Sequence, residues 1–203
     1  PFSIRPMVWG KRADGVVVTA SESCALDIIG IHHHEEVGAG EIIIAEKDGI
    51  KRITTDAENI RKGKPPAHCI FELVYFSRPD SHDYEENVYA VRELLGRKLA
   101  QCEEHEVDIV IPVPDSANFI AVGYSREKNI PYEMGLIRNH YVGRTFIRPD
   151  QAIRDEGVQQ KFNTLPNFFA GKRVVLIDDS IVRGSTIKNI VRMVKNAGAK
   201  EVH

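Results

Sequence analysis

Several sequence features that are diagnostic of a protein class are scarce or missing in this chain of 203 residues. No apolar run approaches the roughly 20 residues that a membrane-spanning helix needs, and no signal-peptide pattern opens the chain. Neither acidic nor basic residues dominate, because the formal net charge is -2, so the charge indicates neither a nucleic-acid nor a membrane partner. These absences favour a cytoplasmic globular protein.

Cysteine is also scarce. The three cysteines, Cys24, Cys69 and Cys102, are odd in number and widely spaced, and none belongs to a CxxC pair. A disulfide framework is therefore not expected, and a reducing compartment fits. The Walker pattern GxxxxGK[ST] and the dinucleotide pattern GxGxxG are missing too, which excludes nucleotide binding through either motif.

The first third of the chain reads as short strands. "GVVVTA" and "EIIIAEKDGI" are β-branched runs bounded by glycine or charge, and they predict buried strands. Consecutive histidines at 32–34 predict a polar loop or strand edge rather than a metal site, because neighbouring strand residues point to opposite faces. The basic, proline-containing "RKGKPPAH" then predicts a domain boundary, with domains over 1–61 and 62–203.

Beyond this boundary, predicted strands alternate with predicted helices. This alternation indicates an α/β fold with a mostly parallel sheet flanked by helices. The strands are "CIFELVYF", "VDIVIPVP" and "RVVLI", and the helices are "NVYAVRELLGRKLAQ", "SANFIAVGYSREKN" and "STIKNIVRMVKNAGAK". The apolar faces are Val88, Val91, Leu94, Leu95 and Leu99 in the first helix and Ile187, Ile190, Val191 and Val194 in the last, which Gly198 ends.

Two adjacent carboxylates follow one predicted strand, in "VVLIDDSIVRGST". Ligands of parallel sheets bind at the carboxyl ends of strands, where Asp178 and Asp179 would lie. Like charges raise each other's pKa unless something compensates them, and Mg²⁺ or a sugar diol would do so. The hydroxyl-rich turn behind them opens a helix and favours a phosphate. The pattern thus predicts a ribose 5-phosphate ligand; the alternative is that the aspartates only cap the next helix.

This stretch resembles the phosphoribosyl pyrophosphate (PRPP) signature of type I phosphoribosyltransferases. "CIFELVYFSRPDS", "IPVPDS", "IPYEMGLIRNHYVGRTFIRPDQAIR" and "DDSIVRGST", in this order, are similar to glutamine amidophosphoribosyltransferases. "SIRPMVWGK" and "TASESCALDIIG" resemble the end of that family's N-terminal-nucleophile glutaminase domain, which implies a β-rich glutaminase remnant over 1–61. The phosphoribosyltransferase domain over 62–203 is expected to be C-terminally incomplete, and the chain is expected to be a segment of a longer protein.

The resemblance implies roles for particular residues. Asp178 and Asp179 would hold the ribose hydroxyls and Mg²⁺, with Ser116 as a further metal-site residue; from spacing alone, Ser116 reads as a helix N-cap. The family's flexible loop corresponds to residues 138–161, in which cations would meet the pyrophosphate. Catalytic roles are implied for Arg138, Arg144 and Lys161, and the PRPP-binding residues would be Asp178, Asp179, Ser180, Val182, Arg183, Gly184, Ser185 and Thr186.

The same loop also carries Arg148 and Arg154, with Gly143 and Gly157 permitting movement; the alternative is a solvated charged loop. Where the family usually reads "KNRYVGRTF", this chain has Arg138 and His140 in place of the lysine and the second basic residue, so the local charge depends on pH. By itself Cys69 reads as a small buried strand residue, but it also matches the first ligand of the family's iron–sulfur subgroup. A 4Fe–4S cluster normally needs four thiolates, so this chain is not expected to assemble one, although a longer parent could.

The implied reaction transfers the phosphoribosyl group of PRPP to ammonia, giving 5-phosphoribosylamine and pyrophosphate, in the first committed step of purine synthesis. The full-length family takes ammonia from glutamine with an N-terminal cysteine, whereas residue 1 here is proline, so glutamine-dependent activity is not predicted for this chain. Purine nucleotides as feedback inhibitors and a homo-oligomer are further family expectations. Two alternatives stay open: a salvage phosphoribosyltransferase that uses a base, and a non-catalytic regulator that senses PRPP.

Overall fold

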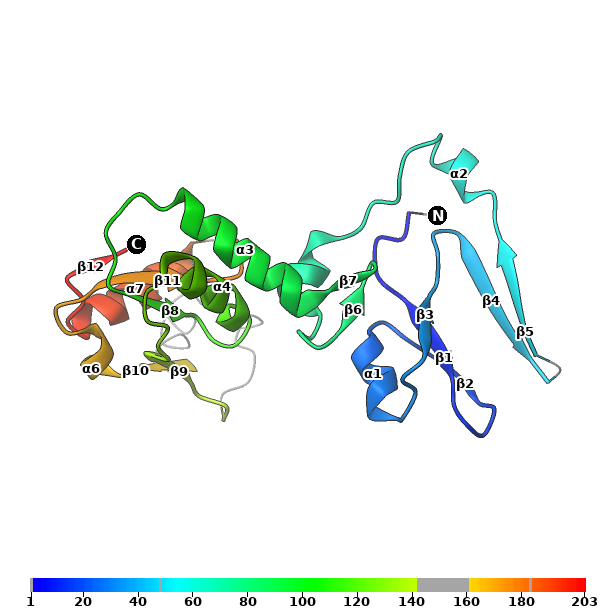
Figure 1. Ribbon diagram of the computed structural model, residues 1–203, viewed down its shortest axis with the longest axis horizontal. Coiled ribbons are helices and arrows are strands. Elements are labelled where there is room, and N and C mark those ends of the chain that lie inside the picture. The colour runs from blue at the N-terminus through cyan, green and yellow to red at the C-terminus, as the bar shows by residue number, and fades with distance from the viewer. Residues whose placement is uncertain (1, 48, 142–160, 183) are drawn as a thin grey trace. The chain divides into compact units, whose positions relative to one another are not determined.

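The computed structural model describes residues 2–47, 49–141, 161–182 and 184–203. The chain folds as two compact units, Pro1–Val91 and Arg92–His203 (Figure 1). These units divide inside a helix. The domain boundary predicted after residue 61 stays a prediction, because a compact unit and a family domain are defined by different criteria.

The first unit is built mainly from short antiparallel strands. Its central sheet has the order β2-β1-β3, and Val8, Leu26 and Ile31 form a small core beneath it. A separate hairpin pairs β4 with β5, and a minimal one pairs β6 with β7. The elements are β1 Val8–Lys11, β2 Val17–Ala20, α1 Ser23–Ile28, β3 His34–Glu36, β4 Glu41–Glu46, β5 Gly49–Thr54, α2 Ala57–Ile60, η1 Glu72–Phe76, β6 His82–Asp83 and β7 Glu86–Asn87.

The strands predicted in the first third are confirmed, but their predicted burial is wrong. No residue of β2 or β4 is fully buried, because β2 is an edge strand and β4 pairs only with β5. The histidines at 32–34 behave as predicted: His32 and His33 are exposed, and His34 begins the edge strand β3.

The strand predicted for "CIFELVYF" is wrong, because this segment forms the π-helix η1. The Ser77 N–H donates to the Glu72 carbonyl at 3.0 Å, which closes a five-residue turn. Glu72 is buried and forms an ion pair with Arg5, whose guanidinium lies 5.1 Å from the ring centroid of Phe76. These contacts with a distant arginine outweigh the strand preference of the β-branched and aromatic residues.

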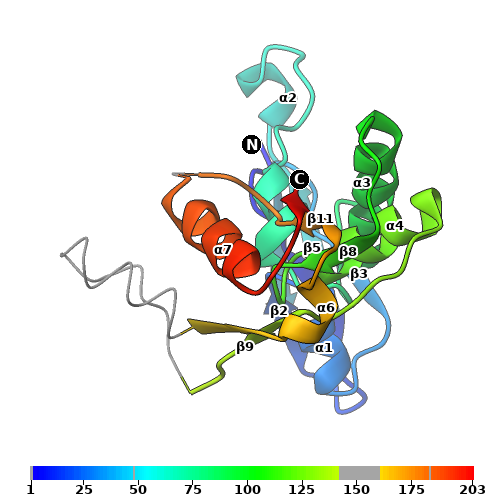
Figure 2. The ribbon, with the colours of Figure 1, turned by 90° about the vertical axis from the view of Figure 1, so that its left-hand side faces the viewer.

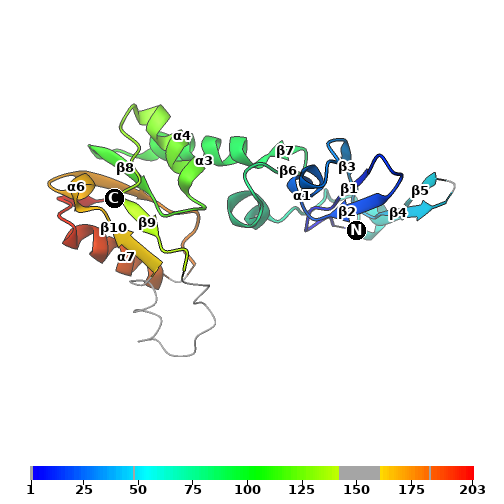
Figure 3. The ribbon, with the colours of Figure 1, turned by 90° about the horizontal axis from the view of Figure 1, so that it is seen from below.

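The second unit contains a parallel sheet of order β12-β11-β8, as predicted. Helix α7 covers one face and α3 and α4 the other, which Figure 2 shows on either side of β11. An antiparallel pair, β9 and β10, lies near α6 (Figure 3). The elements are α3 Val88–Cys102, which begins in the first unit, β8 Ile109–Pro112, α4 Asn118–Lys128, β9 Leu136–Arg138, β10 Phe162–Thr164, α6 Pro166–Phe169, β11 Arg173–Ile177, α7 Ser185–Asn196 and β12 Glu201–Val202.

Helix α7 follows its sequence pattern closely. Ile190 and Val194 are fully buried against the sheet, on the predicted face. Gly198 has a φ of +100°, a conformation that favours glycine and ends the helix as predicted. Among the described residues, no helix has both the length and the apolarity needed to cross a bilayer.

Helix α3 forms where predicted, but its predicted apolar face is only partly buried: Val88 is fully buried, and Val91 and Leu95 are partly buried. Leu94 and Leu99 are 54% and 49% exposed, whereas Arg92, Gly96 and Ala100 are buried at intervals of four residues. The reason is the close crossing with α4: a Cβ at Gly96 would lie 1.8 Å from the Ile120 carbonyl oxygen. The backbones meet at Gly96, so glycine is required at the crossing, and Leu94 and Leu99 lie beside it.

Candidate functional site

The predicted acidic pair lies where two parallel strands end together. Pro112 of β8 pairs with Ile177 of β11, and the Val113 N–H donates to the Ile177 carbonyl at 2.7 Å. The residues that follow each strand therefore leave the sheet at the same edge. This pairing brings Ser116 to Asp179, although 63 positions separate them in the chain.

Two hydroxyl groups hold the Asp179 carboxylate. The Ser116 hydroxyl donates to Oδ2, and the Ser180 hydroxyl donates to Oδ1. One donor comes from the loop after β8 and the other from the loop after β11. The two hydroxyls thus orient the carboxylate. Each of its oxygens keeps a lone pair that can accept another hydrogen bond or bind a cation.

The neighbouring carboxylate has a different environment. Burial, together with the adjacent charge of Asp179, raises the pKa of Asp178 to about 6. The Asp179 N–H donates to Asp178 Oδ1 at 2.9 Å, which acts in the opposite direction. The negative charge of two adjacent carboxylates favours a ligand that compensates it, either a cation or several hydroxyl donors.

The loop behind the aspartates leads into α7 through a glycine. Gly184 is the N-cap residue, with a φ of +70°, and a Cβ there would meet nothing within 4 Å. Backbone conformation, not space, therefore favours glycine at this position. Ile181 and Val182 are 73% and 77% exposed, so the loop presents its backbone and apolar side chains to solvent. The first turn of α7 offers N–H groups and a positive dipole end.

Two of the predicted cations lie at one end of the β9–β10 pair. Phe162 pairs with Arg138, the last residue of β9, and the Asn139 N–H donates to the carbonyl of Lys161, which directly precedes β10, at 2.7 Å. Burial and the neighbouring guanidinium lower the pKa of Lys161. The Arg138 Nη1 also forms an ion pair with Asp115 Oδ2 at 2.7 Å, which ties this pair to the loop after β8.

Other predicted residues lie outside the described part of the chain. They are Gly143, Arg144, Arg148, Arg154, Gly157 and Arg183. Ser185 and Thr186 begin α7 as predicted, and Val182 and Ser180 lie in the loop that precedes it. His140 is exposed, two residues beyond the end of β9.

The structure removes two alternative interpretations. The N-cap residue of α4 is Ala117, and within the described residues no side chain caps this helix, so Ser116 is not its N-cap. The N-cap of α7 is Gly184, five positions after Asp179, so the acidic pair does not cap that helix. Sequence reasoning missed Asp115, the partner of Arg138. Its signal lay within "PVPDS", where an acidic residue directly precedes the serine that was singled out.

The cysteines do not gather into a metal centre of the iron–sulfur type. All three lie in the described part of the chain and are free thiols: Cys24 is buried, Cys69 is partly buried and Cys102 is exposed. Cys69 lies just before η1, and its N–H donates to the Ile4 carbonyl at 2.9 Å. Three thiols do not fit a cluster that needs four thiolate ligands.

The chain is similar to a protein family and to several curated proteins. A family model described as "Phosphoribosyl transferase domain" matches residues 82–203. The chain is 49% identical over 203 residues to the amidophosphoribosyltransferase of Rhizobium etli and 47% identical to the chloroplastic amidophosphoribosyltransferase 1 of Arabidopsis thaliana. The whole chain aligns with each, and it spans 41% and 35% of their respective lengths.

Two solved structures resemble the whole chain. One is the glutamine phosphoribosylpyrophosphate amidotransferase from B. subtilis complexed with ADP and GMP, with a TM-score of 0.84 and 44% identity. The other is described as the allosteric regulatory enzyme of purine biosynthesis, with a TM-score of 0.86 and 44% identity. The chain is covered completely in both, and it covers 43% and 42% of those chains.

Proposed function

Because the chain belongs to the phosphoribosyltransferase domain family, we propose that its acidic pair and the loop into α7 form a PRPP-binding site. The fold expected from the sequence, the α/β fold of type I phosphoribosyltransferases, is confirmed by the parallel sheet and by the similar structures. The observation that carries the proposal is the convergence of Ser116 with Asp179 at the carboxyl ends of β8 and β11.

The oxygen-rich end of the site fits Mg²⁺. Two carboxylates and a hydroxyl are hard oxygen donors, and burial together with the charge of Asp179 raises the pKa of Asp178, which a bound cation would lower again. Asp178, Asp179 and Ser116 would hold the ion, and the same carboxylates would accept hydrogen bonds from the ribose hydroxyls. When bound, the ion neutralises charge on the pyrophosphate as it leaves.

The other end of the site suits a phosphate. The segment from Ser180 to Thr186 would surround the 5-phosphate, with the N–H groups at the start of α7 as donors and Arg183 as a predicted cation. The left-handed conformation of Gly184 lets the backbone turn sharply before the helix begins. The exposed Ile181 and Val182 would contribute their backbone groups, since their side chains offer no donors.

Arg138 and Lys161 would face the pyrophosphate. Arg138 ends β9, Lys161 directly precedes the paired strand β10, and Arg144 is predicted to join them. In the proposed reaction, the bond between C1 of the ribose and the pyrophosphate oxygen breaks, and the nitrogen of ammonia forms the new bond to C1. The pyrophosphate leaves with the bonding electron pair, and the attacking nitrogen loses a proton. Positioning and electrostatic stabilisation would supply most of the rate acceleration.

Ammonia is the proposed acceptor because the curated relatives are named amidophosphoribosyltransferases. Glutamine would be the source of ammonia in proteins of the relatives' length. We also propose purine nucleotides as regulators, because one similar structure is complexed with ADP and GMP. The relatives' names give no support to a salvage enzyme or to a non-catalytic regulator.

Calorimetric titration of PRPP into the chain, with and without Mg²⁺, tests the proposal. An Asp178→Asn, Asp179→Asn double variant is expected to lose Mg²⁺-dependent binding, because it removes both carboxylates. A matched control, Asp27→Asn with Asp80→Asn, changes the charge equally at exposed positions and is expected to bind as the unmodified chain does. Equal, metal-independent binding by all three folded proteins would contradict the proposed site.

A further inference from the structure

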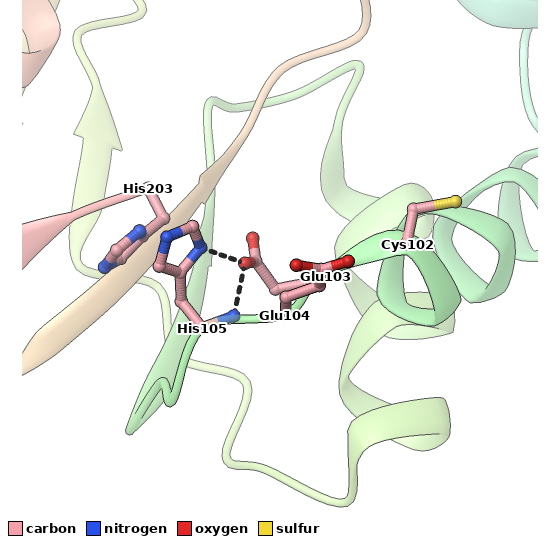
Figure 4. Close-up of a pocket in the computed structure, with 5 residues that line it drawn as sticks. All are labelled: Cys102, Glu103, Glu104, His105 and His203. Atoms are coloured by element: carbon pink, nitrogen blue, oxygen red, sulfur yellow. Dashed lines mark hydrogen bonds and ion pairs between the residues drawn. The ribbon is translucent and has the colours of Figure 1, made fainter.

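A second cluster of ligand-type side chains lies in the second unit, away from the acidic pair. Glu103, His105 and His203 bring one carboxylate oxygen and two ring nitrogens within 4.8 Å of one another. Together with Cys102 and Glu104 they line a pocket of about 430 Å³ (Figure 4). Glu103 and His105 belong to the loop between α3 and β8, and His203 follows β12. The cluster therefore joins segments that are far apart in the chain.

The side chains are already oriented toward one another. The Glu103 carboxylate accepts the His105 backbone N–H at 2.9 Å and lies 2.6 Å from His105 Nδ1. The rings of His105 and His203 lie beside each other, with centroids 4.5 Å apart, and Figure 4 shows the His105 ring between the His203 ring and the carboxylate. His203 Nε2 is shielded from solvent and makes no hydrogen bond within the described residues, although the Glu201 carboxylate lies 3.5 Å away.

The backbone that carries these side chains is held by hydrogen bonds. His203 extends the β12–β11 pairing, since its N–H donates to Val174 and its carbonyl accepts from Leu176, both at 2.9 Å. On the other side, Arg173 at the start of β11 pairs with Asp108 and Glu106 in the loop before β8. Strand β11 lies between β12 and β8 in the sheet. His203 follows β12 and His105 lies in the loop before β8, so the pairing of both strands with β11 positions the two histidines.

The charges around the cluster favour a cation. Glu104 lines the same pocket, and the Glu201 carboxylate lies 3.5 Å from His203 Nε2 while it also pairs with Lys200. Lys128 Nζ donates to the Glu103 carbonyl at 2.6 Å, and Arg173 pairs with its two acids.

We propose that Glu103, His105 and His203 bind a divalent transition-metal cation of the Zn²⁺ class. Two imidazoles and one carboxylate are a donor set that Zn²⁺ accepts, and hard cations such as Mg²⁺ prefer oxygen alone. Three protein ligands leave a fourth position for water in the open pocket. The ion would tie the loop before β8 to the strand beyond β11. It would occupy a site different from the one proposed for Mg²⁺.

Zn²⁺ titration followed by calorimetry tests this site. The background protein carries alanine at 32–34, 68, 82 and 140 and Cys102→Ser, which removes the histidines outside the cluster and the thiol that lines the pocket, and excess Mg²⁺ competes for the acidic pair. We expect one Zn²⁺ per chain. Glu103→Gln, His105→Ala and His203→Ala should each weaken binding at least about 10-fold, because ligand and near-ligand changes typically cost about 10- to 100-fold.

Glu104→Gln is the matched control, because Glu104 lines the same pocket without belonging to the ligand set. This variant is expected to bind Zn²⁺ as tightly as the background protein. Equal affinity of Glu103→Gln and His105→Ala with the background would overturn the proposal, and so would an equal loss in Glu104→Gln. Glu103→Gln and His105→Ala change residues of a loop, so these two variants test the proposal even where His203→Ala fails to fold.

Discussion

The close crossing of α3 and α4 predicts that alanine at a helix glycine lowers the free energy of unfolding, whereas alanine at a solvent-facing glycine raises it. A Cβ at Gly123 would lie 2.0 Å from the Glu93 carbonyl oxygen, whereas ordinary contacts begin near 3.4 Å, so the helices must separate by about 1.4 Å. Overpacking against a backbone atom costs about 3 kcal/mol at the upper end of its usual range. Alanine recovers about 1 kcal/mol of helix propensity. Gly123→Ala should therefore lower the free energy of unfolding by about 2 kcal/mol.

Urea denaturation followed by far-ultraviolet circular dichroism measures this change. At this chain length the same loss corresponds to a Tm about 4–8 °C lower. Lys98→Ala, on an exposed position of α3, is the control and should stay within about 0.5 kcal/mol of the unmodified chain. A Gly123→Ala protein that is more stable than the unmodified chain would refute the close crossing, because that is the result for a solvent-facing helix position.

Three further changes test other parts of the molecule. Burial raises the pKa of Asp83, so the free energy of unfolding should fall as pH rises above the unfolded carboxyl pKa of about 4. In urea titrations, Asp83→Asn should raise the free energy of unfolding at pH 7 and make it less dependent on pH. Hydrogen bonds from Arg173 hold the pKa of Asp108 well below its usual range, so Arg173→Met should destabilise the chain at neutral pH, with the difference shrinking in acid; an unchanged difference would contradict the pairing. Arg138→Met should weaken pyrophosphate binding about 10-fold in calorimetry, whereas Lys98→Met should not.

The parts of the fold that the sequence predicted correctly are those with local causes. β11 is a β-branched run, and α7 has an apolar face and a terminal glycine, so neighbours in the chain determine both elements. The failures have distant causes. The strand predicted over η1 is replaced because Arg5 pairs with Glu72, and the buried face of α3 is set by the backbone of α4.

The candidate site shows the same division. Adjacent carboxylates at a strand end are visible in the sequence, and their position at the sheet edge follows from the α/β pattern. The partners of that edge are less visible. Spacing favoured a helix cap for Ser116, whereas the pairing of β8 with β11 carries its hydroxyl to Asp179. The ion pair between Asp115 and Arg138 depends on where β9 lies, which no local pattern specifies.

The bond between Ser116 and Asp179 also has a consequence for the order of folding. Its two ends are 63 positions apart, and parallel strands pair only after the intervening chain has closed into a large loop. Helix α7 can begin to form from its own turns well before that closure. The completed oxygen cluster is therefore a late event, and during refolding, the recovery of ligand affinity would time the docking of β8 onto β11 rather than the appearance of helix.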